Sequence, residues 1–306
     1  MSSEVTEPDR SRRIAALAFD YGARKTEDVA ECNLCGGTRL FEAASRDRYG
    51  YPASLQLCLR CGLGFLSPRF TAEEYGHFYG RVYRPLVSAY HGRLIDADTV
   101  QDEQRAYAAE LLGFLRASLQ HMPDTVLDVG GSTGVVSAAV SANFGAWATV
   151  IDPSQDELAH AAASGLETVS GFAEDVDLGD RKFGVVLLCQ TIDHLLDVDS
   201  ALRAIRGWVA RDGHVFVDIL DLELVALRQR SLEGAIKIDH PFYLTRDTAL
   251  AFFSKVGLRP VAERRTDDGH LGFLLEPAEP EEPDWDELHR AADRFRERLR
   301  RLGTPT

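Results

Sequence analysis

The middle of the chain alternates short apolar runs with segments whose apolar residues recur three and four positions apart. The short runs predict buried strands, and the periodic segments predict helices that pack on them. The strands are expected at 126–129, 148–151, 167–170, 185–188 and 215–217, and the helices at 100–120, 135–140, 157–163 and 201–209. Such alternation indicates an α/β fold with a mostly parallel sheet covered on both faces.

The pattern changes after residue 217. Two further strands are expected near 259–263 and 271–275, and they flank Gly269 with no room for a crossover helix, so they should pair antiparallel. Residues 277–283, with the sequence PAEPEEP, predict a stiff acidic linker. We therefore divide the chain into five parts. A polar segment that is mobile at its start (1–28) precedes a cysteine-bearing module (29–70) and a helical connector or lid (71–120). The main domain (121–277) and a linker with a terminal helix (278–306) follow.

The terminal helix has one continuous apolar seam. Its apolar positions are alternately three and four residues apart: Trp285, Leu288, Ala292, Phe295, Leu299 and Leu302. An isolated surface helix would not keep these side chains in water, so the seam must dock. Docking on its own chain is favoured, and docking on a second copy, which would make a homodimer, is the alternative.

A glycine-rich loop follows the first predicted strand. Residues 126–134 have the sequence VLDVGGSTG, in which a strand ends, glycines allow a tight turn and a helix begins. Such a loop lets a ligand approach the backbone and the free N–H groups of a helix start. The next strand ends at Asp152, followed by Pro153, where a carboxylate can accept both hydroxyls of a ribose. The loop alone could be a plain turn, but together the two features predict a nucleoside site.

The spacing of this loop carries a family resemblance. From Asp128 it reads Asp-x-Gly-x-Ser-x-Gly, not the Gly-x-Gly-x-x-Gly of dinucleotide-binding proteins. It resembles the first motif of class I SAM-dependent methyltransferases, Asp-x-Gly-x-Gly-x-Gly, with Ser132 in place of the middle glycine. The resemblance covers about residues 121–277. It implies a Rossmann-like seven-stranded sheet with an antiparallel last hairpin, and S-adenosyl-L-methionine (SAM) as the methyl donor.

The resemblance also implies a set of SAM-binding residues. Asp152 and Pro153 would hold the ribose. Residues 171–174, with the sequence GFAE, lie where the family encloses the adenine, but Phe172 stands where an acid is common. Stacking by Phe172, beside Ala173, or a contact from Glu174 would replace that acid, unless Phe172 is a core residue. The residues that would line the rest of the donor are Asp128, Gly130, Gly131, Ser132, Gly134, Gln190 and Thr191, with Tyr79, Tyr83 and Arg84 capping its carboxylate or only packing the lid.

Two histidines are candidates for a general base. Methyl transfer needs positioning and, for some acceptors, removal of a proton, and the acceptor should lie near the end of the fourth strand. His194 follows that strand and either acts as a base or fixes the loop. Related ubiquinone-pathway O-methyltransferases use Glu-x-x-Glu-His here to bind a divalent metal, but Gln190 replaces the first glutamate, which argues against a metal.

The second histidine lies in the sequence KIDHPFY at 237–243. This segment follows the fifth strand, in the region where the fold inserts acceptor-binding loops. His240 is the stronger candidate base, with Asp239 or Tyr243 to orient it. The alternative is a turn held by Pro241.

Four of the five cysteines form two Cys-x-x-Cys-Gly pairs, Cys32 with Cys35 and Cys58 with Cys61, separated by 22 residues. Four thiolates suit a closed tetrahedral structural zinc site, and rubredoxin-type iron has the same ligands. Without a metal, this stretch would have too small a core to fold. Together with the SAM motif, the module resembles the zinc-ribbon methyltransferases of bacterial sugar and natural-product pathways.

Composition narrows the function further. The chain has 306 residues and a net charge of -14, which disfavours nucleic acid as a partner. No apolar run is long enough to span a membrane, and the N-terminus lacks the apolar core of a signal peptide, so a cytoplasmic protein is expected. We expect methylation of carbon or oxygen on a small metabolite, such as a sugar nucleotide or a natural-product intermediate. An RNA methyltransferase that grips RNA with the ribbon, and a SAM-binding interaction protein without turnover, are the alternatives.

Overall fold

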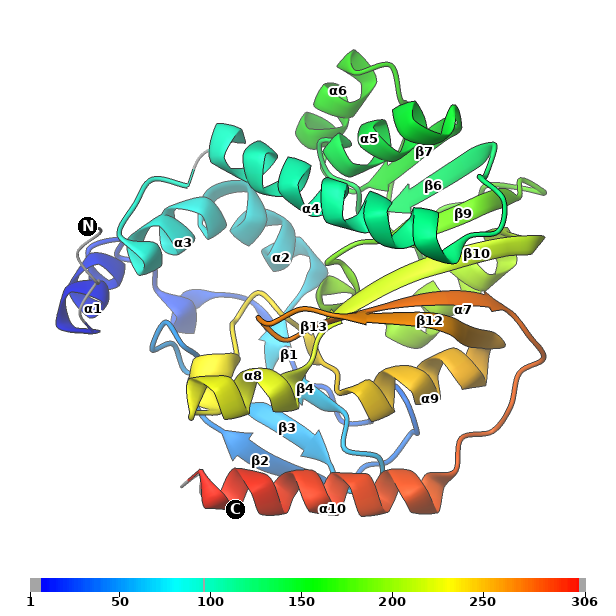
Figure 1. Cartoon of the computed structure of the whole chain (residues 1–306). Helices are drawn as coiled ribbons and strands as arrows, with labels where there is room; N and C mark the ends of the chain where they lie inside the picture. The colour runs from blue at the N-terminus through cyan, green and yellow to red at the C-terminus, as the bar shows by residue number, and fades with distance from the viewer. Residues whose placement is uncertain (1–6, 96, 303–306) are drawn as a thin grey trace. The chain divides into compact units, whose positions relative to one another are not determined.

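The computed structural model describes residues 7–95 and 97–302 (Figure 1). The chain forms two compact units. Unit 1 comprises residues 1–100, 222–243 and 289–306, and unit 2 comprises 101–221 and 244–288. Residues 222–243, which sequence analysis included in the main domain, therefore cluster with the cysteine-bearing module.

Unit 2 is built on a seven-stranded sheet with the order β12-β13-β10-β9-β6-β7-β8. The first five strands along the chain are parallel, and β13 runs antiparallel to both β10 and β12. The predicted α/β class and the antiparallel last hairpin are thus confirmed. The strands are β6 (Thr125–Val129), β7 (Trp147–Asp152), β8 (Glu167–Ser170), β9 (Phe183–Leu188), β10 (Val209–Leu220), β12 (Leu258–Arg265) and β13 (His270–Pro277).

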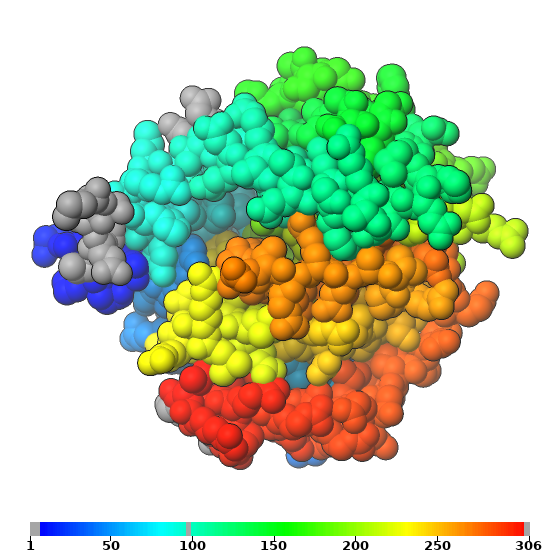
Figure 2. Space-filling model, viewed as in Figure 1, coloured from blue at the N-terminus to red at the C-terminus, as the bar shows by residue number. Residues whose placement is uncertain are grey.

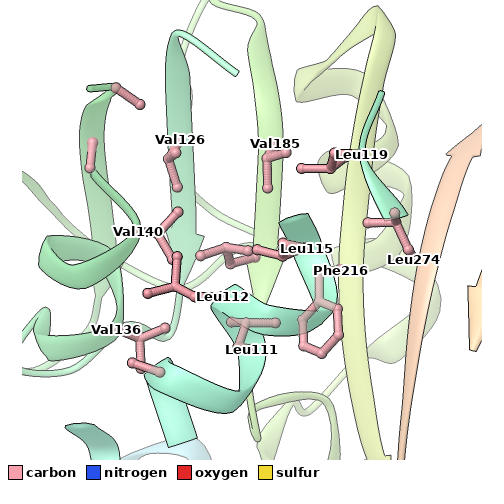
Figure 3. Close-up of a cluster of buried hydrophobic side chains, with 14 residues drawn as sticks. Leu111, Leu112, Leu115, Leu119, Val126, Val136, Val140, Val185, Phe216 and Leu274 are labelled. Carbon is pink, nitrogen blue, oxygen red and sulfur yellow. The ribbon is translucent and has the colours of Figure 1, made fainter. Parts of the chain in front are cut away.

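Helices cover both faces of this sheet. On one face, Leu111 and Leu115 of α4 and Leu119, which follows the helix, form one buried cluster with Val126 and with other side chains of the central strands (Figure 3). The helical spacing of the leucines in the sequence reflects this burial. On the other face, α7 and α9 pack against each other (Figure 1). The helices are α4 (Ala97–Ser118), α5 (Val135–Phe144), α6 (Gln155–Ala163), α7 (Val198–Trp208) and α9 (Arg246–Val256), with a 3-10 turn η2 (Ile192–His194).

Unit 1 contains a four-stranded antiparallel sheet with the order β11-β4-β3-β2. Its edge strand β11 comes from a part of the chain far from the other three. A separate pair joins β1 to β5. The elements are α1 (Glu7–Ala15), η1 (Tyr21–Ala23), β1 (Thr26–Glu27), β2 (Leu40–Ala44), β3 (Leu55–Cys58), β4 (Gly64–Leu66), β5 (Arg69–Phe70), α2 (Ala72–Arg81), α3 (Tyr83–His91), α8 (Leu222–Gln229), η3 (Glu233–Ala235), β11 (Phe242–Tyr243) and, from His289 onward, α10 (Trp285–Arg301).

The N-terminal segment contains elements that the sequence did not predict, namely α1, η1 and β1. The polar helix α1 is held by long-range hydrogen bonds: Arg10 Nε and Arg13 Nε donate to backbone carbonyls of residues 90 and 89 in the last turn of α3, at 3.3 and 2.8 Å. Cations at a helix C-terminus satisfy its free carbonyls. The mobility expected for the first residues falls on 1–6, which lie outside the described residues.

The terminal helix α10 docks within the chain, as favoured from its seam. Ala292, Phe295 and Leu299 are buried, and the backbone of Gly62 packs directly on Ala292. His289 Nδ1 lies 2.9 Å from the carbonyl oxygen of Leu59. The opposite face of α10 is exposed at the surface (red in Figure 2). None of the described helices is both long and apolar enough to cross a membrane.

Candidate functional site

The glycine loop between β6 and α5 has a backbone that only small residues allow. Gly130 has φ 72°, and a Cβ there would lie 2.4 Å from Thr191 Cγ2. A Cβ on Gly131 would lie 2.7 Å from Asp128 Oδ2. Gly134, at φ 76°, is the N-cap of α5. The loop is therefore compressed from both sides, which explains why the sequence keeps glycine at these positions.

Asp152, at the end of β7, faces this loop. Its Oδ2 accepts a hydrogen bond from Ser132 N at 3.0 Å, and its Oδ1 accepts one from Ser154 N at 2.8 Å. Each carboxylate oxygen can accept a second hydrogen bond, so the group can still hold two ribose hydroxyls. Burial raises the pKa of Asp152, and the two N–H donors oppose that rise. Pro153, the next residue, is exposed.

Asp128 lies beneath the loop. It is 1% exposed and accepts a hydrogen bond from Ser137 Oγ in the first turns of α5. Burial raises the pKa of Asp128 to about 6. Its contacts fix the junction of β6 and α5, so Asp128 supports the loop from within.

The segment after β8 rules out one of the alternatives for Phe172. This side chain is 43% exposed, so the interpretation of Phe172 as a core residue is wrong. Ala173 beside it is buried. Glu174 accepts a hydrogen bond from Asp197 N through Oε1 at 3.4 Å, and its Oε2 is buried with no hydrogen-bond partner among the described residues. Phe172 is available to stack on a ligand, and Glu174 has an acceptor to offer.

The turn after β9 closes the other side of the loop, where Thr191 contacts Gly130. Gln190 has φ 50°, and its N–H donates to Asp218 Oδ1 at 2.5 Å. Asp218 also accepts a hydrogen bond from Tyr107 OH at 2.7 Å, and burial raises the pKa of Asp218. Asp218 and Tyr107 are not among the residues predicted for the site. The available signal was a carboxylate inside the otherwise apolar strand 215–219.

A family model described as a methyltransferase domain matches residues 100–263, just over half of the chain. The chain belongs to this methyltransferase family. It is a SAM-dependent methyltransferase, and its sheet has the topology of that class. No curated protein matches the chain significantly.

Solved structures resemble this methyltransferase in fold. A proposed O-methyltransferase from Nostoc punctiforme is 20% identical, with a TM-score of 0.50 over 62% of this chain and 60% of that one. The 1,6-didemethyltoxoflavin-N1-methyltransferase of Burkholderia thailandensis, solved with that compound and S-adenosylhomocysteine, is 18% identical, with a TM-score of 0.49 over 71% and 96%. A SAM-dependent methyltransferase from Clostridium acetobutylicum is 11% identical, with a TM-score of 0.49 over 68% and 99%.

The two candidate bases of the methyltransferase belong to different units. In unit 2, His194 ends the turn η2 and is half-buried. Its backbone N–H donates to Thr191 O at 2.9 Å. In unit 1, His240 Nε2 and Lys237 Nζ each lie 3.5 Å from Asp239 Oδ2. Asp239 is fully buried and His240 is 4% exposed. The Asp239 carboxylate thus lies against both the Lys237 ammonium and the His240 imidazole.

Tyr243 and Tyr83 have structural contacts in unit 1. The Tyr243 hydroxyl donates to Lys237 O and accepts from Lys237 N at 2.7 Å. Tyr243 therefore fixes the backbone of Lys237, three residues before His240. Burial raises the pKa of Tyr243 well above its ordinary value. Tyr83 packs in an aromatic cluster, with its ring centroid 5.4 Å from that of Tyr79 and 6.2 Å from that of Phe78.

The four paired cysteines of unit 1 come together, with their sulfur atoms within 4.8 Å of one another. The Cys32–Cys61 and Cys35–Cys58 sulfur pairs are both 3.5 Å apart. A tetrahedron with metal–sulfur bonds of about 2.3 Å has edges of about 3.8 Å, so the donor set fits zinc. The glycine after each pair has a positive φ, 65° at Gly36 and 81° at Gly62, as the tight turns require. Cys189 instead packs against the core of unit 2.

Proposed function

We propose that this methyltransferase acts on a small metabolite and that His240 removes the proton of the acceptor. The observation that carries the proposal is the buried pairing of His240 Nε2 with Asp239 Oδ2 at 3.5 Å. A carboxylate beside an imidazole orients the ring and stabilises its protonated form. Asp239 is thus the orienting group, and His240 is the proton acceptor.

The residues of unit 2 are suited to hold the donor. Asp152 would bind the ribose, the loop from Gly130 to Gly134 would lie against the amino-acid part, and Phe172 would stack on the adenine. Gln190 and Thr191 would line the donor beside the glycine loop, while His194 would shape the turn after β9. When bound, SAM supplies a methyl group on a positively charged sulfur, so the chain itself has to provide orientation and a proton acceptor.

The methyl acceptor that we propose is a particular class of small metabolite. We favour a sugar nucleotide or a natural-product intermediate, methylated on carbon or oxygen. The support is the resemblance to zinc-ribbon methyltransferases and the net charge of -14, which would repel a polyanion such as RNA. Reduced cysteines at metal-binding distances are typical of a cytoplasmic protein, which we propose as its location.

The proposal assigns zinc a structural role at Cys32, Cys35, Cys58 and Cys61. Four thiolates leave no open position for a substrate, and the binding energy of such a site contributes directly to folding. Backbone hydrogen bonds close the tight turns that carry the paired cysteines: Gly36 N donates to Cys32 O at 2.8 Å, and Gly62 N donates to Cys58 O at 2.9 Å.

The test measures S-adenosylhomocysteine formation with a panel of nucleotide sugars, small hydroxylated compounds and total RNA. We expect turnover with a member of the first two groups. His240→Ala should then slow it by roughly a hundredfold while SAM binding is retained. His160→Ala, at an exposed position on α6, is the matched control. Turnover on RNA alone would contradict the proposal and favour an RNA methyltransferase. SAM binding without turnover on any acceptor would contradict it and favour a SAM-binding interaction protein.

A further inference from the structure

One buried carboxylate of the ribbon lies against the segment that carries the candidate base. Asp47 follows β2 and is 3% exposed. Its Oδ1 accepts hydrogen bonds from Tyr49 N and Tyr51 N, both at 2.9 Å. Its Oδ2 accepts one from Ile238 N at 3.1 Å, across 191 residues of sequence. The side chain therefore closes its own turn with one oxygen and holds a distant backbone with the other.

The segment held in this way has no helix or strand of its own. Residues 236–240 lie between η3 and β11. Besides the Asp47 contact, Arg48 N donates to Ile236 O at 3.0 Å, and Tyr79 OH donates to Asp239 O at 2.7 Å. The Tyr243 hydroxyl holds Lys237, and His240 N donates to Lys237 O at 3.2 Å within the segment. Because no strand ladder fixes residues 236–240, their conformation depends on these bonds and on the groups from residues 47–48 and α2.

We propose that Asp47 is a positioning residue, through which the ribbon holds Asp239 and His240 in the geometry needed for proton transfer. This inference rests on the proposed role of His240. Ile238 directly precedes Asp239, so a shift of its backbone moves the carboxylate that lies against His240. A displacement of about 1 Å in a catalytic group can cost about a hundredfold in rate.

The substitution Asp47→Asn isolates this role because it preserves shape. An amide keeps one acceptor oxygen but turns an N–H donor toward either Ile238 N or the N–H pair of Tyr49 and Tyr51. Three N–H groups, two of them in buried hydrogen bonds, then compete for one oxygen. Burial raises the pKa of Asp47 to about 7, so the comparison is made at pH 8, where the carboxylate is charged. Glu42→Gln, at an exposed acid on β2 that accepts from Ser54 Oγ, is the matched control.

The experiment is hydrogen exchange on the full-length zinc-loaded protein, which needs no acceptor. In the wild type, the Ile238 amide should be protected although it lies outside regular structure. In Asp47→Asn, residues 236–240 should exchange about tenfold faster or more, with zinc content and SAM binding unchanged. The ring carbon signals of His240, recorded with labelled histidine, should move in Asp47→Asn and stay in place in Glu42→Gln.

The outcomes separate this inference from the proposed function. An unprotected Ile238 amide in the wild type would overturn the inference even if Asp47→Asn fails to fold. Unchanged exchange and unchanged His240 signals in a folded Asp47→Asn would overturn it as well. If His240→Ala leaves turnover intact, the base assignment fails whatever the exchange data give, and Asp47 would then be a structural residue only.

Discussion

The two units of this methyltransferase hold their functional residues by different means. In unit 2, the donor-binding loops follow strands that are anchored in a continuous apolar core, in which α4 covers the central strands. In unit 1, the ribbon combines four clustered sulfur atoms with buried side chains such as Phe65 and Phe70, and the His240 segment is held by a few long-range hydrogen bonds. Apolar burial spreads stability over many side chains, whereas a metal site or a buried hydrogen bond concentrates it. The sulfur cluster and the hydrogen bonds of the His240 segment should therefore fail at single positions, whereas the apolar cores should weaken gradually.

The largest effect is expected at the cysteine cluster. Cys35→Ser removes one thiolate of four, so the protein should lose close to one equivalent of zinc and unit 1 should unfold, because binding of a structural zinc supplies about 10–16 kcal/mol to small zinc modules. Elemental analysis and hydrogen exchange check both parts. Cys189→Ala, outside the cluster, should keep its zinc. A folded, metal-free Cys35→Ser protein would contradict this account.

The next effect is expected in the docking of α10. Phe295 is 3% exposed, so Phe295→Ala should destabilise the protein by about 3–5 kcal/mol. Arg294→Ala, at an exposed neighbouring position, should have little effect on thermal melting. A chain truncated after Glu276 should melt earlier with an unchanged oligomeric state by light scattering. A dimer that becomes a monomer on truncation would favour the contact between copies.

A smaller effect, confined to SAM binding, is expected at Gly130. Gly130→Ala places a Cβ 2.4 Å from Thr191 Cγ2, so the loop must move and SAM affinity should fall about a hundredfold, or about 2.7 kcal/mol. Gly145→Ala shares the positive φ but meets no atom within 4 Å, so it should bind SAM normally. Equal affinities of the two variants would show that the loop does not bind the donor.

The smallest effect is expected at the edge of the unit 2 sheet. A hydrogen-bonded Arg181 lowers the pKa of Glu167 from 4.5 to about 2. A carboxyl with a lowered folded-state pKa stabilises the fold above its unfolded pKa, and this contribution is lost as the pH falls from about 4.5 to 2. Glu167→Gln should cost about 1 kcal/mol at pH 7, because the pair is partly exposed to solvent. Urea unfolding at several pH values should show that the difference in unfolding free energy between wild type and Glu167→Gln shrinks as the pH falls. Glu110→Gln is the exposed control. A difference independent of pH would exclude the ion pair as its cause.

Sequence patterns predicted the parts of the molecule that local residues determine. Strands β6 and β7, with Gly130 and Asp152 at their ends, follow from apolar runs and loop chemistry within short windows. The Gly36 and Gly62 turns follow from the cysteine spacing in the same way. The pairing of β11 with β4 and the contact between Asp47 and Ile238 join distant segments, so no local pattern records them. The helix α1 was missed because its polar sequence depends on the carbonyls of α3.

The donor site of unit 2 can be tested in one measurement, by titration calorimetry of SAM into the full-length protein and its Asp152→Ala variant. The wild type should bind with an affinity on the order of micromolar. The affinity of the variant for SAM should be at least about tenfold lower, because two ribose hydrogen bonds to a carboxylate are removed. Asp156→Ala, at an exposed acid on α6, should match the wild type. Equal binding by wild type and Asp152→Ala would contradict the assigned site, and absence of SAM binding in the wild type would contradict the account as a whole.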